Sequence, residues 1–154
     1  MESQKKVNKE MDNITPSAAA LVIDNNFVLL VRHEDGADHI TGVYGLPSGR
    51  VEEGETEIEA ARRELEEESG LKADVSDLSE FEGNYYQAKI PRKDGSIVNF
   101  GWKVFRVSKW SGDLGSRDGH TTPEWVDIDT LGDLEEKGQL LPNTINAVNA
   151  SLNK

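Results

Sequence analysis

The chain has no cysteine, which excludes disulfide bonds, thiolate nucleophiles and thiolate metal sites. It has no apolar run that approaches the length of a membrane span, and residues 1–13, MESQKKVNKEMDN, lack the apolar centre of a secretory signal. Basic residues are scarce, because 17 Lys and Arg stand against 29 Asp and Glu, for a formal charge of −12. Binding to DNA, RNA or an anionic membrane needs a basic surface, so we expect none, and we expect a cytoplasmic location.

The 154 residues are enough for one domain with a core, and no repeat or linker divides them. We expect a loose, solvated arm at residues 1–12 and a single domain at residues 13–154. Apolar patterns predict strands at residues 16–24, 27–32, 81–90, 97–110 and 125–128. They also predict helices at residues 56–69 and from about residue 142 onward. Strands mixed with a few helices are typical of an α/β fold, with a mixed sheet flanked by helices.

The helix predicted at residues 56–69 carries unusual negative charge. Its start fits a capping box, with Thr56 and Glu59 in the T-x-x-E pattern, and Gly70 stands where a C′ glycine ends a helix. The segment RRELEEESGL at residues 62–71, however, concentrates glutamates near the carboxyl end, where the helix dipole favours cations. Local helix physics therefore disfavours this arrangement, and something else must compensate for it.

A helical projection divides the glutamates into two groups. At about 100° per residue, Glu64, Glu67 and Glu68 share a narrow face beside the core-facing stripe, whereas Glu59 and Glu66 point to the solvent side. Carboxylates that converge at i, i+3 and i+4 make a hard oxygen site suited to Mg²⁺ or Mn²⁺. The alternative is a solvated acidic face, which is the usual reading of such a charge run.

The segment around this helix resembles a known motif. Residues 49–71, GRVEEGETEIEAARRELEEESGL, resemble the Nudix box, G-x5-E-x7-R-E-U-x-E-E-x-G-U with U aliphatic, at every fixed position. Chance agreement is on the order of one in a billion. The resemblance implies a Nudix-type α/β/α sandwich with a mixed sheet. It also implies an enzyme that uses divalent cations to cleave a pyrophosphate bond in a nucleoside diphosphate linked to another group.

The resemblance also implies roles for individual residues. Glu64, Glu67 and Glu68 match the metal-binding glutamates, and Glu67 is in addition a candidate base or water-positioning group. Arg63 matches the arginine that orients these glutamates, with an ordinary surface ion pair as the alternative. The catalytic set implied by the resemblance is therefore Glu67, Glu64 and Arg63, with Mg²⁺ or Mn²⁺ as the cofactor.

Other positions of the motif are structural or additional. The residues expected to support the box are Gly49, Glu55 and Gly70. Ser48 departs from the glycine common in the family, and its backbone carbonyl is a candidate metal ligand, provided that its backbone needs no positive φ. A further ligand or base is expected from a loop after the box, where Asp118 and Glu124 are the candidates, with solvated loop charges as the alternative.

The substrate is less well defined than the reaction. Five aromatic residues are candidates to stack on a base: Tyr85, Tyr86, Phe100, Trp102 and Trp125. Most aromatic residues in strands, however, belong to the core. Markers of ADP-ribose and NADH hydrolases are absent, so a MutT-type nucleoside triphosphate pyrophosphohydrolase is the first choice by elimination. ADP-ribose, a nucleotide sugar or a dinucleoside polyphosphate remain alternatives, as does a nucleotide sensor without turnover. The expected partner is a small nucleotide, and homodimer formation stays open.

Overall fold

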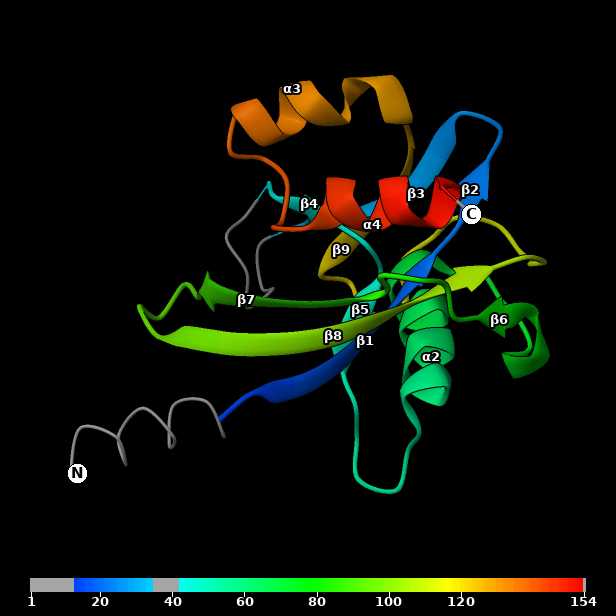
Figure 1. Cartoon of the computed structure of the whole chain (residues 1–154), viewed down its shortest axis with the longest axis horizontal. Helices are drawn as coiled ribbons and strands as arrows, with labels where there is room; N and C mark the ends of the chain where they lie inside the picture. The colour runs from blue at the N-terminus through cyan, green and yellow to red at the C-terminus, as the bar shows by residue number, and fades with distance from the viewer. Residues whose placement is uncertain (1–12, 35–41, 154) are drawn as a thin grey trace.

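The computed structural model describes residues 13–34 and 42–153 of the chain. The arm expected at residues 1–12 lies outside the described residues. The described chain forms two β-sheets, with α2 on one side and α3 and α4 on the other (Figure 1). Within this part of the chain, no helix is long and apolar enough to span a membrane.

The first sheet is mixed. Its described strands are, in spatial order, β5 (Ser48–Arg50), β1 (Thr15–Leu21), β8 (Ile97–Val107) and β6 (Leu78–Ser79), with β7 (Tyr85–Pro91) also paired to β8. Strands β1 and β8 run parallel, and the other pairs are antiparallel. The register places Ser17 of β1 between Trp102 of β8 and Arg50 of β5. The predicted mixed sheet flanked by helices is confirmed.

The second sheet is antiparallel and contains β2 (Ile23–Asp24), β3 (Phe27–His33), β4 (Tyr44–Gly45) and β9 (Thr121–Asp127). Strand β9 begins four residues before the predicted strand at residues 125–128, so the prediction of a loop through residue 124 is wrong. The reason is tertiary, because residues 121–124 pair with residues 30–33 of β3. Pro123 lies in β9 along an edge of the described sheet, where a missing N–H is tolerated.

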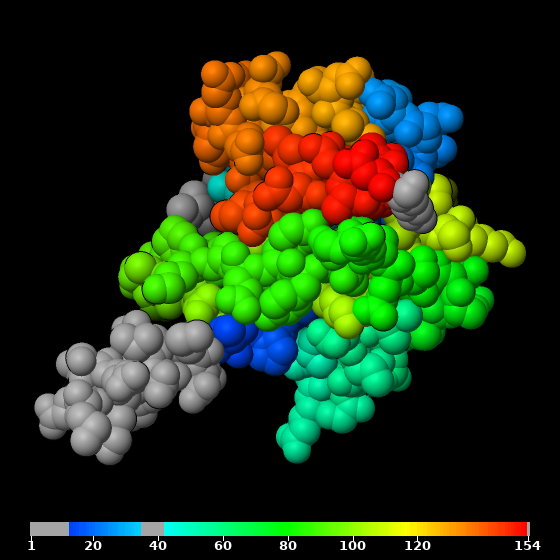
Figure 2. Space-filling view, in the orientation of Figure 1, coloured from blue at the N-terminus to red at the C-terminus, as the bar shows by residue number. Residues whose placement is uncertain are grey.

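Strand β1 separates the two halves of the core because successive side chains point to opposite faces. Ala18 and Ala20 pack toward α2 (Glu57–Ser69), whose buried stripe includes Leu65. Ala19 and Leu21 face the other side, where α4 (Thr144–Leu152) and α3 (Leu131–Glu136) cover the sheet. In the space-filling view, α4 lies between α3 and the β7–β8 hairpin (Figure 2).

The predicted boundaries of α2 are confirmed. Thr56 is the N-cap, its hydroxyl accepts the Glu59 N–H at 3.2 Å, and the Glu59 carboxylate accepts the Thr56 N–H at 2.9 Å. Gly70 caps the other end with φ of 82°, and its N–H donates to the Glu66 carbonyl. A side chain at Gly70 would also overlap the backbone of the segment around residue 115, so this glycine serves both conformation and packing.

Several other expectations need correction. The strand predicted at residues 81–90 begins only at Tyr85, because Phe81 and the following residues form a turn with Gly83 at φ of 79°. Strand β8 ends at Val107 rather than at Trp110. Helix α3 and the short 3-10 helices η1 (Val75–Asp77) and η2 (Ile128–Thr130) were not predicted. These segments are too short to show a hydrophobic period.

Candidate active site

Glu68 is the most enclosed carboxylate of the acidic face of α2. It is 8% exposed, and its Oε1 accepts the backbone N–H of Ser48 at 2.7 Å. Burial raises the pKa of Glu68 well above its usual value, and the charges of Glu64, Asp118 and Glu67 act in the same direction. The single hydrogen bond from Ser48 opposes this shift without cancelling it. A buried carboxylate with so little compensation is costly unless a cation or a proton neutralises it.

Glu64 lies against β5 at the position of Gly49. A Cβ atom at Gly49 would overlap the carboxylate of Glu64, with Oε2 at 2.8 Å and the other carboxylate atoms nearer still, so a side chain there would require this carboxylate to move. Burial raises the pKa of Glu64 to about 7. Arg63 opposes the shift, whereas the charges of Glu67 and Asp118 add to it. The structure therefore gives Gly49 a steric reason to be glycine.

Arg63 connects the acidic face to the loop before α2. Its guanidinium donates to Glu55 through Nε at 2.7 Å and through a second nitrogen at 3.0 Å, and it bonds the Arg50 carbonyl. Its remaining nitrogen reaches Glu64 at 2.7 Å and Glu67 at 3.3 Å. The hydrogen bonds from Arg63 lower the pKa of Glu55. Glu67 keeps 47% of its side-chain surface exposed, so it is more open to a substrate than Glu55 and Glu64.

The loop at residues 111–120 is fixed to the end of α2. The N–H groups of Arg117 and Asp118 donate to the Glu67 carbonyl at 2.8 and 3.2 Å, so they satisfy a carbonyl that the helix leaves free. The Arg117 side chain pairs with Glu66 at 2.6 Å. Glu66 was expected to point to the solvent side, and it pairs there with Arg117 at the surface, 51 residues along the chain.

The loop brings Asp118 to the acidic face. One carboxylate oxygen, Oδ1, accepts hydrogen bonds from Ser116, from the N–H of His120 and from Thr121. Burial would raise the pKa of Asp118, but these bonds together hold it below the usual value. Asp118 in turn raises the pKa values of Glu64 and Glu68, which places its charge in their field.

Glu124 lies elsewhere. It sits in β9, opposite Leu30 of β3, and not in a loop after the box. Its side chain hydrogen-bonds the hydroxyl of Tyr44, whose pKa is raised by burial and then by this bond. Of the two loop candidates, Asp118 is therefore the one whose charge is shown acting on the glutamates.

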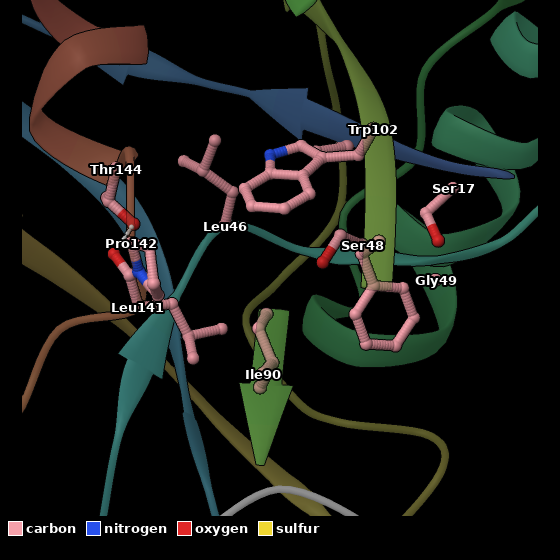
Figure 3. A pocket seen from close by; sticks show the side chains of 11 residues that line it. Ser17, Leu46, Ser48, Gly49, Ile90, Trp102, Leu141, Pro142 and Thr144 are labelled. Atoms are coloured by element: carbon pink, nitrogen blue, oxygen red, sulfur yellow. Dashed lines mark hydrogen bonds between the residues drawn. The ribbon is translucent and has the colours of Figure 1, made fainter. Parts of the chain in front are cut away.

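A pocket opens on the other side of β5, with about 530 Å³ of empty space that includes some open solvent. Its lining is Ser17, Ala19, Leu46, Ser48, Gly49, Ile90, Phe100, Trp102, Leu141, Pro142 and Thr144 (Figure 3). None of these described residues carries a charge. Of the five aromatic candidates, Phe100 and Trp102 line this pocket, whereas Trp125 packs against Trp110 with ring centroids 6.2 Å apart.

Ser48 joins the pocket to the acidic face. It lines the pocket, and its N–H donates to Glu68. It belongs to a short strand and lacks the positive φ that would have strained a serine, because Asn25 and Asn143 are the non-glycine residues with positive φ in the described chain. Sequence reasoning missed the pocket residues Ser17, Leu46 and Leu141, since they come from separate segments and carry no local signal.

The acidic face fits a divalent cation by its donor chemistry. In residues 13–34 and 42–153, no three His, Asp or Glu side chains are already arranged as a finished ligand set. Glu64 and Glu67 turn instead toward Arg63, which neutralises part of their charge. Glu68 is buried where its charged form is disfavoured, and a bound cation would favour that form, since hard oxygen donors of this kind suit Mg²⁺ or Mn²⁺.

The fold is shared with known proteins. The MutT protein of Methanosarcina mazei superposes with a TM-score of 0.69 at 21% identity, over 92% of this chain and 96% of that chain. At this identity the likeness shows a common fold.

The sequence comparisons then give the family. The model of the NUDIX domain matches residues 14–145. The chain is 31% identical to the 8-oxo-dGTP diphosphatase of Haemophilus influenzae over 146 residues, covering 94% of this chain and 96% of that protein. It is 34% identical to an RNA pyrophosphohydrolase of a Bradyrhizobium species over 86 residues, which cover 54% of this chain and 48% of that protein. The chain belongs to the Nudix family and is a Nudix hydrolase.

Proposed function

We propose that the chain is a pyrophosphohydrolase dependent on Mg²⁺ or Mn²⁺ that converts a nucleoside triphosphate to the monophosphate and pyrophosphate. The observation that carries the proposal is the buried, incompletely neutralised acidic face of α2, which meets an uncharged pocket at Ser48. This arrangement suits a ligand with a charged phosphate end and a neutral planar end. An acidic protein accepts such an anion because cations screen the phosphates.

The surroundings of each side chain suggest a separate role for it in the proposed reaction. Glu64 and Glu68 hold the cation, with Glu67 and the Ser48 carbonyl as further ligands and Asp118 as an additional ligand or base. When bound, the divalent cation neutralises the phosphates and activates water for attack on phosphorus. Arg63 holds Glu64 and Glu67 in place.

Glu67 is the candidate to orient or deprotonate the attacking water. It is more open to solvent than Glu55 and Glu64, which Arg63 also holds. A general base must reach the proton that it removes, and an exposed carboxylate beside the phosphate position meets this condition. Glu67→Gln should therefore abolish most of the activity while leaving the fold intact.

A triphosphate is favoured over the other substrates by the similarity to the Haemophilus diphosphatase, which extends over almost the whole of both chains. The match to an RNA pyrophosphohydrolase covers about half of each chain, and the formal charge of −12 disfavours an RNA chain as ligand. ADP-ribose, nucleotide sugars and dinucleoside polyphosphates are the remaining substrates to compare. Binding of a nucleotide without turnover is the alternative function.

The test is a substrate panel with Mg²⁺ or Mn²⁺ and separate detection of phosphate and pyrophosphate. The panel contains the nucleoside triphosphates, oxidised ones included, together with ADP-ribose, nucleotide sugars, dinucleoside polyphosphates and triphosphate-ended RNA. A monophosphate with pyrophosphate as products supports the proposal. Loss of activity in Asp118→Asn but not in Glu124→Gln supports the assigned role of Asp118. Tight nucleotide binding without any product would show a sensor instead.

A further inference from the structure

The hydroxyl of Ser17 is the unexplained polar group of the pocket. Ser17 is 4% exposed and lines the pocket, yet its Oγ has no hydrogen-bond partner among the described residues. Thr144, across the pocket from Ser17 in Figure 3, differs, since its hydroxyl donates to the Leu141 carbonyl at 2.8 Å. A buried hydroxyl without a partner costs stability, so its presence calls for an explanation.

Packing does not supply that explanation. Ser17 is followed in β1 by Ala18, Ala19 and Ala20, all fully buried, so the strand accepts alanine at each neighbouring position. Alanine at position 17 would fill nearly the same volume without the unsatisfied oxygen. A partner from outside the described residues, such as a bound ligand, would satisfy this hydroxyl.

The surroundings of Ser17 define the chemistry of its partner. Trp102 lies beside it in the register of β1 and β8, and Phe100 and Ile90 add apolar wall. An aromatic ring stacks on a flat neutral group, and the absence of charge among the described lining residues disfavours an ionic one. A sugar would bring several hydroxyls to a wall that offers few polar partners. A nucleobase, with flat faces and a polar edge, fits best.

We infer that Ser17 is a specificity-determining residue, whose hydroxyl bonds the polar edge of a nucleobase that stacks on Trp102. The inference rests on the proposed function, because it places the phosphates of the same nucleotide at the acidic face. Ser48 and Gly49 line the pocket and also contact Glu68 and Glu64, so the two places adjoin at β5. A site that bonds a polar edge rejects an analogue that lacks it, since the hydroxyl is then left unpaired again.

The experiment compares wild type with Ser17→Ala on two ligands: the preferred nucleoside triphosphate and an analogue whose base lacks exocyclic groups. In wild type the natural base should have a KM at least about tenfold lower than the analogue. Ser17→Ala should remove most of this difference, leave kcat within about threefold, and leave the melting temperature of the free protein unchanged or higher. Ser151→Ala is the matched control, because the Ser151 hydroxyl is buried but bonded to Arg106 at 2.6 Å. It should lower the melting temperature and leave the base preference intact.

Binding of a non-hydrolysable nucleoside triphosphate, measured by calorimetry in the same variants, separates the two proposals. If wild type turns over nucleotides but Ser17→Ala keeps the wild-type base preference, the inference about Ser17 is overturned and the proposed function stands. If wild type hydrolyses no nucleotide, the proposed function fails. The calorimetric comparison then decides the role of Ser17. A loss of base preference in Ser17→Ala supports the inference, and an unchanged preference overturns it.

Discussion

The two ends of α2 treat negative charge in opposite ways. At the amino end, Glu59 accepts hydrogen bonds from the N–H and hydroxyl of Thr56, and these bonds lower its pKa. At the carboxyl end, Glu64 and Glu68 are buried, and their pKa values are raised. The first end is satisfied by its own residues. At the second end, the helix does not stabilise the charged forms of Glu64 and Glu68. Carboxylates in such surroundings are typical of functional sites, including sites that bind a cation.

The largest effect on activity is expected from Glu68→Gln, which keeps an acceptor for the Ser48 N–H and removes the charge. Activity should fall by about a hundredfold or more, because the variant removes a proposed cation ligand. At a pH high enough to ionise Glu68, the metal-free protein should become more stable, because an uncompensated buried charge is gone. Steady-state kinetics and thermal melting in a chelator measure the two effects. Glu135→Gln, on the exposed surface of α3, is the control and should change neither. If Glu68→Gln kept wild-type activity, the carboxyl end of α2 would have no special role in activity compared with the amino end.

Gly49→Ala tests the same end from the side of β5. The added Cβ must displace the carboxylate of Glu64, so we expect a loss of about tenfold to a hundredfold in kcat/KM and a weaker apparent affinity for Mg²⁺. Gly132→Ala is the matched control, because a Cβ there meets open space in the described structure. If Gly49→Ala kept full activity, the close packing of Glu64 on β5 would have no functional meaning.

The contrast also predicts a pH dependence of the metal-free protein. The pKa of Glu64 is raised to about 7 by burial, so between pH 4.5 and 7 the folded state binds more protons than the unfolded state. The free energy of unfolding should therefore fall as the pH rises through this window, by roughly 1–3 kcal/mol. Denaturant unfolding in a chelator measures it, and Glu64→Gln should lose this part of the dependence. Saturating Mg²⁺ should also remove it, because the cation favours the charged carboxylate.

The smallest effect is expected at the amino end. Thr56→Ala removes the N-cap hydroxyl and should destabilise the protein by about 1 kcal/mol. Activity per folded molecule should stay within about twofold, because Thr56 is exposed and remote from the acidic face. Denaturant unfolding and kinetics on the same preparation give both values. A large loss of activity in this variant would show that the two ends are not independent.

The same contrast explains what the sequence could predict. The capping box of Thr56 and Glu59 depends on neighbours in the chain, so its pattern predicted the start of α2 to the residue. The face shared by Glu64, Glu67 and Glu68 followed from helical spacing. The different environments of these three glutamates did not, because β5 and the loop carrying Asp118 create them. The pocket was not predictable either, since Ser17, Trp102 and Leu141 meet only after the sheet forms.

The double contact of β5 has a thermodynamic consequence. Ser48 and Gly49 touch the acidic face with one side of the strand and the pocket with the other, over two residues of backbone. If a ligand in the pocket shifts this backbone, the acidic face changes too, and the reverse also holds. Binding at the pocket and binding at the acidic face are then linked. Linkage is reciprocal, and the factor by which a cation strengthens nucleotide binding equals the factor by which the nucleotide strengthens cation binding. Under the proposed function, the three-residue strand β5 would couple the binding of the cation to that of the nucleotide.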